Sequence, residues 1–217
     1  MITVSDLFNL EHTMAKEYLA GFDYPWQALE GIGDLILQLG QALGEDYRQV
    51  TPEVWVHGSA KVADTAFIAG PCIIGARTEI RPGAFIRGNV LVGENCVIGN
   101  STELKNCILF DGVQVPHYNY VGDSILGYKA HLGAGAVTSN VKSDKSPVVI
   151  RGEENIPTGR KKVGAMVGDH VEVGCGAVLN PGTVIGRNSQ VYPLSCVRGV
   201  VGENCIHKNN GEIVKKR

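Results

Sequence analysis

The sequence predicts an all-β fold: a parallel β-helix of hexapeptide repeats, preceded by N-terminal helices. Three observations predict it: a six-residue apolar period, a high glycine content and a scarcity of large aromatic residues. The chain has 217 residues, of which 28 are Gly, five are Phe and two are Trp. Chains of this composition commonly stack many short turns instead of wrapping around one large core.

An apolar residue recurs every six positions from Val56 onward. The residues in this frame are Val56, Val62, Ile68, Ile74, Ile80, Ile86, Val92, Ile98, Leu104 and Phe110. The frame breaks near Pro116, resumes at Leu126 and Leu132, and breaks again. A second run consists of Val167, Val173, Leu179, Ile185, Val191 and Val197. Each unit supplies a strand of about four residues and a turn of about two, so stacked units share one apolar interior.

The repeat divides the chain into segments. Residues 1–50 are predicted to be a helical N-terminal segment, residues 51–208 the β-helix domain, and residues 209–217 a tail with a short strand and a basic end. Residues 139–163 interrupt the repeat with charged side chains and no periodicity. We expect a protruding loop there, because long insertions in compact folds are often functional.

The N-terminal segment contains signals for two helices. Ser5 is a predicted N-cap for a helix that runs through Leu19 and ends at Gly21, and Pro25 begins a second, amphipathic helix. The ends of a solenoid need covering. We therefore expect these helices to cap the first coil or to extend a contact between subunits.

Composition excludes several classes of protein. With 20 basic and 22 acidic residues, the chain shows no charge bias toward nucleic acid or a membrane surface. No apolar run approaches the ~18 residues of a membrane helix, and the N-terminus lacks the pattern of a secretory signal, so a cytoplasmic location is expected. The six cysteines lack CxxC spacing and are interpreted as buried thiols, not as disulfides or zinc ligands.

Non-repetitive motifs occur where the hexapeptides are interrupted. Residues 99–106 contain Glu-Leu-Lys-Asn, residues 115–123 contain Pro-His-Tyr-Asn-Tyr-Val-Gly-Asp, and residues 131–140 contain a Gly-Ala-Gly-Ala segment. Together with Thr-Gly-Arg-Lys-Lys-Val-Gly-Ala at 158–165, these segments resemble the C-terminal acetyltransferase domain of bifunctional sugar-1-phosphate nucleotidylyltransferases. The resemblance covers about residues 54–200 and is greater to archaeal-type and stand-alone members. It implies a left-handed β-helix, the known exception to right-handed crossovers.

The resemblance also implies an activity. This family transfers acetyl from acetyl-CoA to the amine of an amino-sugar 1-phosphate such as glucosamine 1-phosphate, at sites between the subunits of a homotrimer. No metal or redox cofactor is required. The 50 residues before the repeat are too few for a nucleotidylyltransferase domain, so none is expected in this sequence. His117 matches the family's general base, and imidazole suits that task because it titrates near neutral pH.

The remaining site residues are assigned by the same resemblance. The positions that hold the sugar or orient the base correspond to Glu103, Tyr120 and Asn140, and those that bind the phosphate to Arg87, Lys105 and Lys162. Arginine suits a phosphate through its paired donors. The family's phosphate-binding arginine lies eighteen residues before the lysine that corresponds to Lys105, which points to Arg87, whereas the local Arg-Pro-Gly sequence falls at Arg81, one hexapeptide earlier. Because one hexapeptide moves a side chain to another face of a three-sided coil, Arg87 is preferred.

Acetyl-CoA is expected to bind along later coils. The family's cofactor path corresponds to Ala134, Cys175 and Pro193, where the pantetheine arm bonds mainly to backbone groups. Cys175 is interpreted as structural, because the chemistry needs no covalent intermediate.

Two departures leave alternatives open. His131 stands where the family pattern has Asn, and the loop before Lys162 is longer than in the bacterial enzyme. A non-catalytic module that binds a sugar phosphate or nucleotide, or assembles with a separate nucleotidylyltransferase, is the main alternative. A zinc hydratase with the same fold needs three convergent histidines. It is disfavoured because His117 and His131 are 14 residues apart and His57 is 60 residues from His117.

Overall fold

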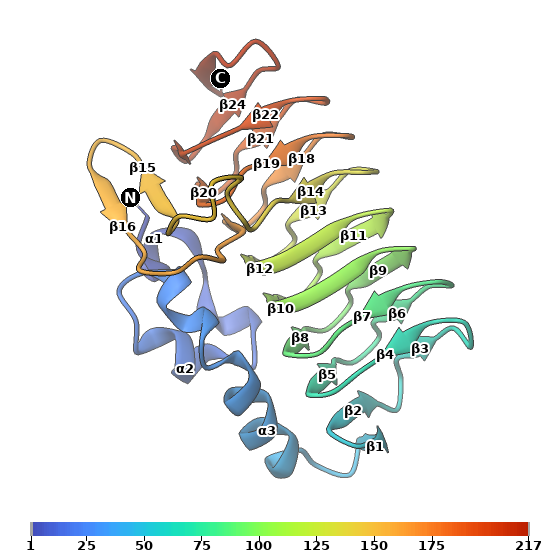
Figure 1. The fold of residues 1–217 in the computed structure, drawn as a ribbon. Helices are drawn as coiled ribbons and strands as arrows, with labels where there is room; N and C mark the ends of the chain where they lie inside the picture. The colour runs from blue at the N-terminus through green and yellow to red at the C-terminus, as the bar shows by residue number, and fades with distance from the viewer. Residues whose placement is uncertain (1, 217) are drawn as a thin grey trace.

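A computed structural model describes residues 2–216, in which short helices precede a long β-solenoid (Figure 1). The helices are α1 (Val4–Leu7), η1 (Leu10–His12), α2 (Lys16–Ala20), η2 (Pro25–Leu29) and α3 (Ile32–Ala42). Gly21 ends α2 and Pro25 begins η2, as predicted, but the two continuous helices predicted are wrong, because α1, η1 and α2 divide the first and η2 and α3 divide the second. The prediction of Ser5 as N-cap is wrong, because the Thr3 side chain accepts from the backbone N–H of Asp6. None of the described helices is long and apolar enough to cross a membrane.

The solenoid has three faces, named here for later use. The helix-covered face contains β2 (Val54–His57), β5 (Cys72–Ile74), β8 (Val90–Val92), the second halves of β10 (Glu103–Leu109) and β12 (Tyr120–Leu126), β17 (Ala165–Val167), β20 (Thr183–Ile185) and β23 (Val200–Val201). The β11 face contains β3 (Lys61–Val62), β6 (Glu79–Ile80), β9 (Val97–Asn100), β11 (Gln114–His117), β13 (His131–Leu132), β18 (Glu172–Val173), β21 (Gln190–Val191) and β24 (Cys205–His207). The Tyr120 face contains β4 (Phe67–Ile68), β7 (Phe85–Ile86), the first halves of β10 and β12, β14 (Val137–Thr138), β19 (Val178–Leu179) and β22 (Cys196–Val197).

Neighbouring coils pair in parallel along all three faces. Val54 pairs with Cys72 and Cys72 with Val90, a step of one coil each time. The predicted fold class, an all-β left-handed parallel β-helix of hexapeptide repeats with N-terminal helices, is confirmed.

The predicted repeat frame is wrong in one place. Leu109, not Phe110, pairs with Val92, so the coil between them is one residue short. The next coil is short as well, since Leu126 pairs with Leu109. The shortened corners lie at Asn106 and Asp123, whose φ angles are +47° and +48°.

The frame does not break at Pro116. This residue lies inside β11, next to Val115, which pairs with Ile98 in regular register. Proline is tolerated in such a strand when its missing N–H is not needed for the ladder.

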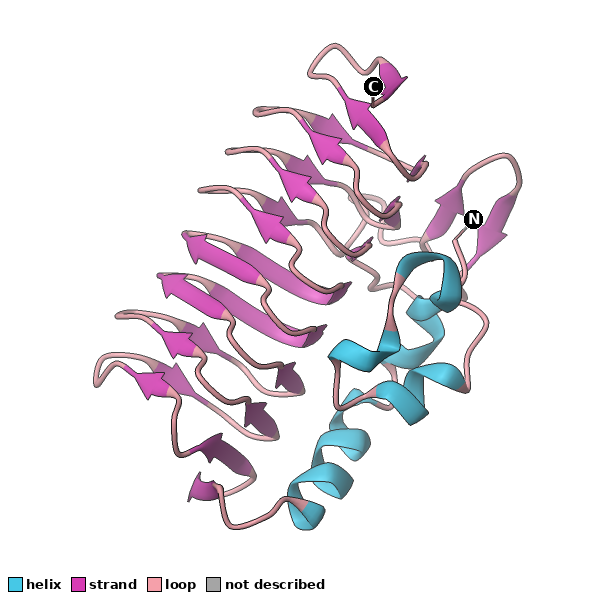
Figure 2. Cartoon of the chain, turned by 180° about the vertical axis from the view of Figure 1, so that it is seen from behind, coloured by secondary structure: helices cyan, strands magenta, loops and turns pink. Residues whose placement is uncertain are grey.

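The N-terminal helices cover one flat face of the solenoid, as Figures 1 and 2 show from opposite sides. The outward row of this face is apolar and at most 1% exposed; it consists of Ile73, Leu91, Ile108, Ile125, Met166 and Val184. Helix α3 contacts β5, β8 and β10, and η2 contacts β12. A side chain at Gly40 of α3 would lie 2.6 Å from the Trp55 ring, so glycine permits this close approach. Burial of this row stabilises the fold by removing apolar area from water.

The expectation that the helices cap the first coil is therefore wrong. Val62, on the inward side of that coil, remains 40% exposed. The helical part ends at Ala42, and the last residues of the segment predicted as helical form β1 (Tyr47–Thr51), which pairs antiparallel with β2.

The insertion at 139–163 contains a β-hairpin. Its strands β15 (Val149–Arg151) and β16 (Asn155–Pro157) pair antiparallel. Val148 and Ile150 are fully buried against the solenoid. Gly182 has a φ of +78°, and a Cβ there would lie 2.8 Å from Val148 Cγ1, so the absence of a side chain at Gly182 allows the hairpin to pack closely against the solenoid. The prediction of a protruding loop is thus wrong for this part of the insertion, which is a β-hairpin packed against the solenoid.

The tail forms β25 (Ile213–Lys215), antiparallel to β24. The short strand predicted there is present. The basic end extends to Arg217, which lies outside the described residues.

A stability measurement tests how the helices contribute. Leu91→Ala should lower the free energy of unfolding by about 2–5 kcal/mol, because it leaves a cavity beneath α3. The matched change Val50→Ala, at a side chain that is 57% exposed, should alter it by at most about 0.5 kcal/mol. Urea unfolding at several protein concentrations measures both. Equal costs for the two variants would contradict the packing described for this face.

Candidate active site

One corner of the solenoid, between the β11 face and the Tyr120 face, carries the predicted base and the predicted cofactor residues in a single row. Each step along the row is marked by a backbone hydrogen bond. These bonds run from Gly135 N–H to the His117 carbonyl (3.0 Å), from Gly176 N–H to the Ala134 carbonyl (2.8 Å), and from Leu194 N–H to the Cys175 carbonyl (2.9 Å). Successive coils are about 4.8 Å apart. His117, Ala134, Cys175 and Pro193 therefore follow one another along this corner.

The backbone of His117 is fixed while its side chain is exposed. Its N–H donates to Asn119 Oδ1 at 3.1 Å. Asn119 is 2% exposed, and its Nδ2 donates to the carbonyls of Gly133 (2.8 Å) and Ala136 (3.0 Å) on the next coil. This buried amide was not predicted. It occupies an interior position held by Thr102 on the coil before.

Tyr120 begins the strand that leaves this corner. Its hydroxyl accepts a hydrogen bond from Asn140 Nδ2 at 3.1 Å. Burial raises the pKa of Tyr120, so the phenol is neutral near pH 7 and its hydrogen is available to a ligand. A Cβ at Gly122 would lie 2.4 Å from the Tyr120 hydroxyl, so glycine leaves room for the ring where it crosses the face.

Asp123 lies at the far end of the same strand segment, at the shortened corner. Its Oδ1 accepts from Asn106 Nδ2 at 2.9 Å, and its Oδ2 accepts from Asn140 Nδ2 at 2.5 Å. Lys105 Nζ lies 3.5 Å from Oδ2. The carboxylate side chain is only 5% exposed, so these donors compensate for its burial. Asp123 therefore joins the corner at Asn106, the side chain of Lys105 and the start of the insertion at Asn140.

A basic pocket opens beside Asp123. Its volume is about 590 Å³. It is lined by Leu29, Glu30, Asn89, Lys105, Asn106, Asp123, Gly159, Arg160, Lys161 and Lys162. Two predicted phosphate ligands, Lys105 and Lys162, thus meet in one pocket although they are far apart in sequence. Arg160 and Lys161, which were not predicted, add to its positive charge. The pocket has four cationic side chains against two acids, Asp123 and Glu30, so it keeps a net positive charge that suits an anion.

Arg87 lies next to Lys105 on the Tyr120 face but outside the basic pocket. Its neighbour Ile86 pairs with Leu104, and its Nη1 lies 2.7 Å from Glu103 Oε1. Arg81 follows a strand of the β11 face and contacts Glu79 at 3.3 Å. The two arginines are on different faces, as the hexapeptide argument predicts.

His131 lies in β13 of the β11 face, where its Nδ1 is 2.7 Å from Glu172 Oε2. Within residues 2–216, no three His, Cys, Asp or Glu side chains converge in the manner of a metal site.

Comparisons with known proteins support the family resemblance that the sequence motifs indicate. Residues 68–156 match the family model described as the GMPPB C-terminal domain. The bifunctional protein GlmU of Methanococcus maripaludis is 36% identical over 125 residues, which cover 58% of this chain and 28% of that protein. A bifunctional sugar-1-phosphate nucleotidylyltransferase/acetyltransferase of Sulfurisphaera tokodaii is 30% identical over 216 residues, covering 93% of this chain and 53% of that protein.

The chain therefore spans about half the length, or less, of these curated relatives. Among solved structures, a perosamine N-acetyltransferase of Caulobacter crescentus gives a TM-score of 0.40 at 18% identity, over 85% of this chain and 66% of that one. The polySia specific acetyltransferase NeuO gives 0.48 at 13% identity, over 76% of this chain and 88% of that one. The resemblance predicted from the sequence, to the hexapeptide-repeat acetyltransferase domain of bifunctional sugar-1-phosphate nucleotidylyltransferase/acetyltransferases, is confirmed.

Proposed function

We propose that this protein is an acetyl-CoA-dependent N-acetyltransferase that acts on an amino-sugar 1-phosphate. One observation carries the proposal: a single strand segment, from Tyr120 to Gly122, joins the His117 corner to the corner of the basic pocket. Three residues of strand span about 10 Å. Because the C2 amine and the C1 phosphate of a hexosamine 1-phosphate are on neighbouring carbons, the substrate lies over this segment and the side chains span the rest: the His117 imidazole reaches the amine, and the long Lys105 and Lys162 side chains reach the phosphate.

The chemistry requires one base and no covalent intermediate. The amine of the sugar loses a proton to His117 as its nitrogen attacks the thioester carbonyl. The carbon–sulfur bond then breaks, and the CoA sulfur leaves as a thiol with a proton returned from the imidazole. Because the Asn119 amide fixes the backbone of His117, the imidazole is presented from a rigid corner.

The acceptor is held by groups on the Tyr120 face. Tyr120 donates its hydroxyl hydrogen to the sugar, since Asn140 already donates to its oxygen. Lys105 and Lys162 bind the phosphate, with Arg160 and Lys161 adding positive charge. Arg87 and Glu103, joined as an ion pair, form the adjoining wall of the sugar site.

Acetyl-CoA lies along the row of Ala134, Cys175 and Pro193. The small side chains in this row leave the backbone accessible to the pantetheine amides. Two curated relatives support the reaction class, since one is named a sugar-1-phosphate nucleotidylyltransferase/acetyltransferase and the other a bifunctional GlmU. A cytoplasmic location fits this co-substrate and stays a prediction.

The proposed function includes assembly into a homotrimer, with a subunit contact on the Tyr120 face. Phe67 and Phe85 on the Tyr120 face are 58% and 42% exposed, and their rings lie 5.5 Å apart. Exposed aromatic pairs commonly mark contacts between subunits. A neighbouring subunit on this face closes the acceptor site from the other side.

Replacing the proposed base tests the reaction. His117→Ala should lower kcat for thiol release from acetyl-CoA with glucosamine 1-phosphate by about 10²- to 10⁴-fold. His57→Ala serves as the control, because His57 lies far along the solenoid and bonds Ser59 Oγ at 2.8 Å. No thiol release from the unaltered protein with any amino-sugar phosphate would refute the activity. Calorimetry that detects sugar-phosphate binding without acetyl-CoA binding would favour the non-catalytic alternative.

Removing a phosphate ligand tests the basic pocket. Lys162→Met should raise KM for glucosamine 1-phosphate by about ten- to hundred-fold, because a charge-assisted hydrogen bond is lost. Its effect on unphosphorylated glucosamine should be much smaller. Lys61→Met, at an exposed lysine of β3, is the control. Equal losses with both acceptors would show that Lys162 does not bind the phosphate.

The oligomeric state tests the shared site. Sedimentation should find a trimer, and Phe85→Arg should convert it to monomers with reduced activity, because a charge would be buried in the contact. Val50→Arg, at an exposed position of β1, should leave the trimer intact. A stable monomer of the unaltered protein would contradict the proposed arrangement.

A further inference from the structure

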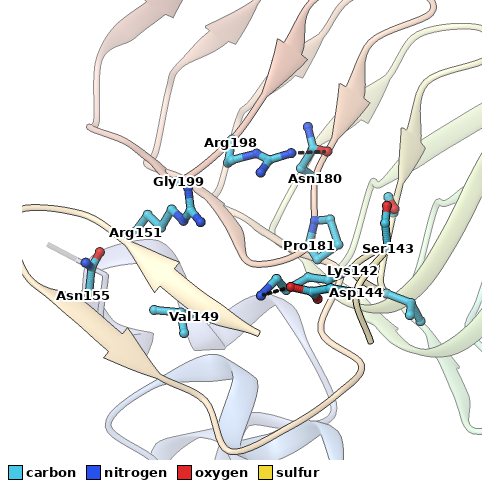
Figure 3. A pocket seen from close by; sticks show the side chains of 12 residues that line it. Lys142, Ser143, Asp144, Val149, Arg151, Asn155, Asn180, Pro181, Arg198 and Gly199 are labelled. Carbon is cyan, nitrogen blue, oxygen red and sulfur yellow. Dashed lines mark hydrogen bonds and ion pairs between the residues drawn. The ribbon is translucent and has the colours of Figure 1, made fainter. Parts of the chain in front are cut away.

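A second cavity lies between the insertion and the later coils of the solenoid (Figure 3). Its volume is about 660 Å³, within the range of small-molecule sites. The insertion supplies Lys142 and Arg151, while the solenoid supplies Asn180, Pro181 and Arg198. None of these five residues belongs to the site proposed for acetyl transfer.

The wall that the insertion supplies is held in place. The hairpin is anchored by the buried side chains of Val148 and Ile150. Its base is closed by a hydrogen bond of 2.7 Å from the Val148 N–H to the Arg160 carbonyl. Gly199, with a φ of +84°, accommodates the hairpin, since a Cβ there would lie 2.6 Å from the Arg151 carbonyl oxygen. The cavity is therefore formed before any ligand binds.

Positive charge in the cavity exceeds negative charge. Three cationic side chains line it, Lys142, Arg151 and Arg198, against the single carboxylate of Asp144. Hydrogen bonds from the backbone N–H of Ser146, which has the largest effect, and from its hydroxyl lower the pKa of Asp144, so its carboxylate stays ionised. Lys142 Nζ lies 3.5 Å from Asp144 Oδ2. Asp144 thus neutralises Lys142.

The two arginines lack such a partner. Among residues 2–216, the ion pairs include no carboxylate bound to Arg151 or Arg198. Arg198 Nη2 lies 3.4 Å from Asn180 Oδ1, a neutral acceptor. Two guanidinium groups on one cavity repel each other unless an anion lies between them. Guanidinium groups bind phosphate oxygens in pairs, which favours a phosphate anion.

We propose that this cavity binds a nucleoside diphosphate group. The two unbalanced positive charges match the two negative charges of a pyrophosphate ester. Val149 and Pro181 supply an apolar surface for a base, and the amides of Asn155 and Asn180 can donate to or accept from its edge. A single phosphate would leave most of the cavity unfilled.

Two sources of this group are available, and they approach the cavity from different sides. Ser139 lines the cavity and adjoins Asn140, which bonds Tyr120 in the acceptor site. In the first, the acceptor is a sugar nucleotide whose sugar lies near Tyr120 and whose diphosphate turns along this side to the arginines instead of entering the basic pocket; this source rests on the proposed acetyl transfer and replaces its sugar 1-phosphate by the nucleotide-linked sugar. The other source is the diphosphate of CoA, which reaches the cavity across the Tyr120 face.

Calorimetry on the full chain tests the site directly. UDP and ADP should bind saturably, inorganic phosphate much more weakly, and Arg151→Gln or Arg198→Gln should each raise the Kd of the nucleotide by about ten-fold or more. Arg198→Lys should give an intermediate loss, because it keeps the charge but not the paired donors. Arg48→Gln, at an exposed arginine of β1, should leave Kd unchanged.

A competition experiment identifies the source. If saturating CoA leaves UDP binding unchanged, the cavity serves the acceptor nucleotide; if CoA abolishes it, the cavity serves CoA. Absence of saturable binding, or binding that Arg151→Gln and Arg198→Gln leave unchanged, would overturn the proposal. These readouts require no acetyl transfer, so failure of the site and failure of the proposed activity are distinguishable.

Discussion

The backbone ladder between parallel coils is the constraint on which the rest of this structure depends. It fixes each residue above its equivalent on the coil before, at a spacing of about 4.8 Å. A side chain that recurs once per coil therefore forms a row. A coil that is one residue shorter moves the sequence positions of every later row one residue earlier. Two consecutive coils are shortened, at Asn106 and Asp123, and the candidate site is built around them.

The shortened corner joins parts of the chain that are distant in sequence. The Asp123 carboxylate binds Asn106 and Asn140, so it ties the corner to the start of the insertion. The insertion leaves the solenoid here and returns at Val163, whose N–H donates to the Asn140 carbonyl at 3.0 Å. The basic pocket and the arginine-lined cavity are consequently two openings along one corner, separated by the insertion. A regular solenoid would have neither.

The fold and the His117 row were predictable because both follow from periodicity and from motif positions. Asn119 was missed because the predicted frame ran on to Phe110, which placed the interior position one residue late. The position of the N-terminal helices could not be predicted from the sequence either, because the outward apolar row of Leu91 and Ile108 does not indicate which segment covers it. The hairpin has too few residues to show a period, and its docking depends on Gly182, which lies outside it.

The central claim is that the strand segment from Tyr120 to Gly122 has the catalytic base and acetyl-CoA at one end and the phosphate-binding lysines at the other. A crystal structure with CoA and glucosamine 1-phosphate bound tests it most directly. The account predicts the CoA sulfur beside His117, its pantetheine arm along Ala134 and Cys175, and the phosphate between Lys105 and Lys162. A sulfur bound away from the His117 corner, or a phosphate outside the basic pocket, would contradict the account.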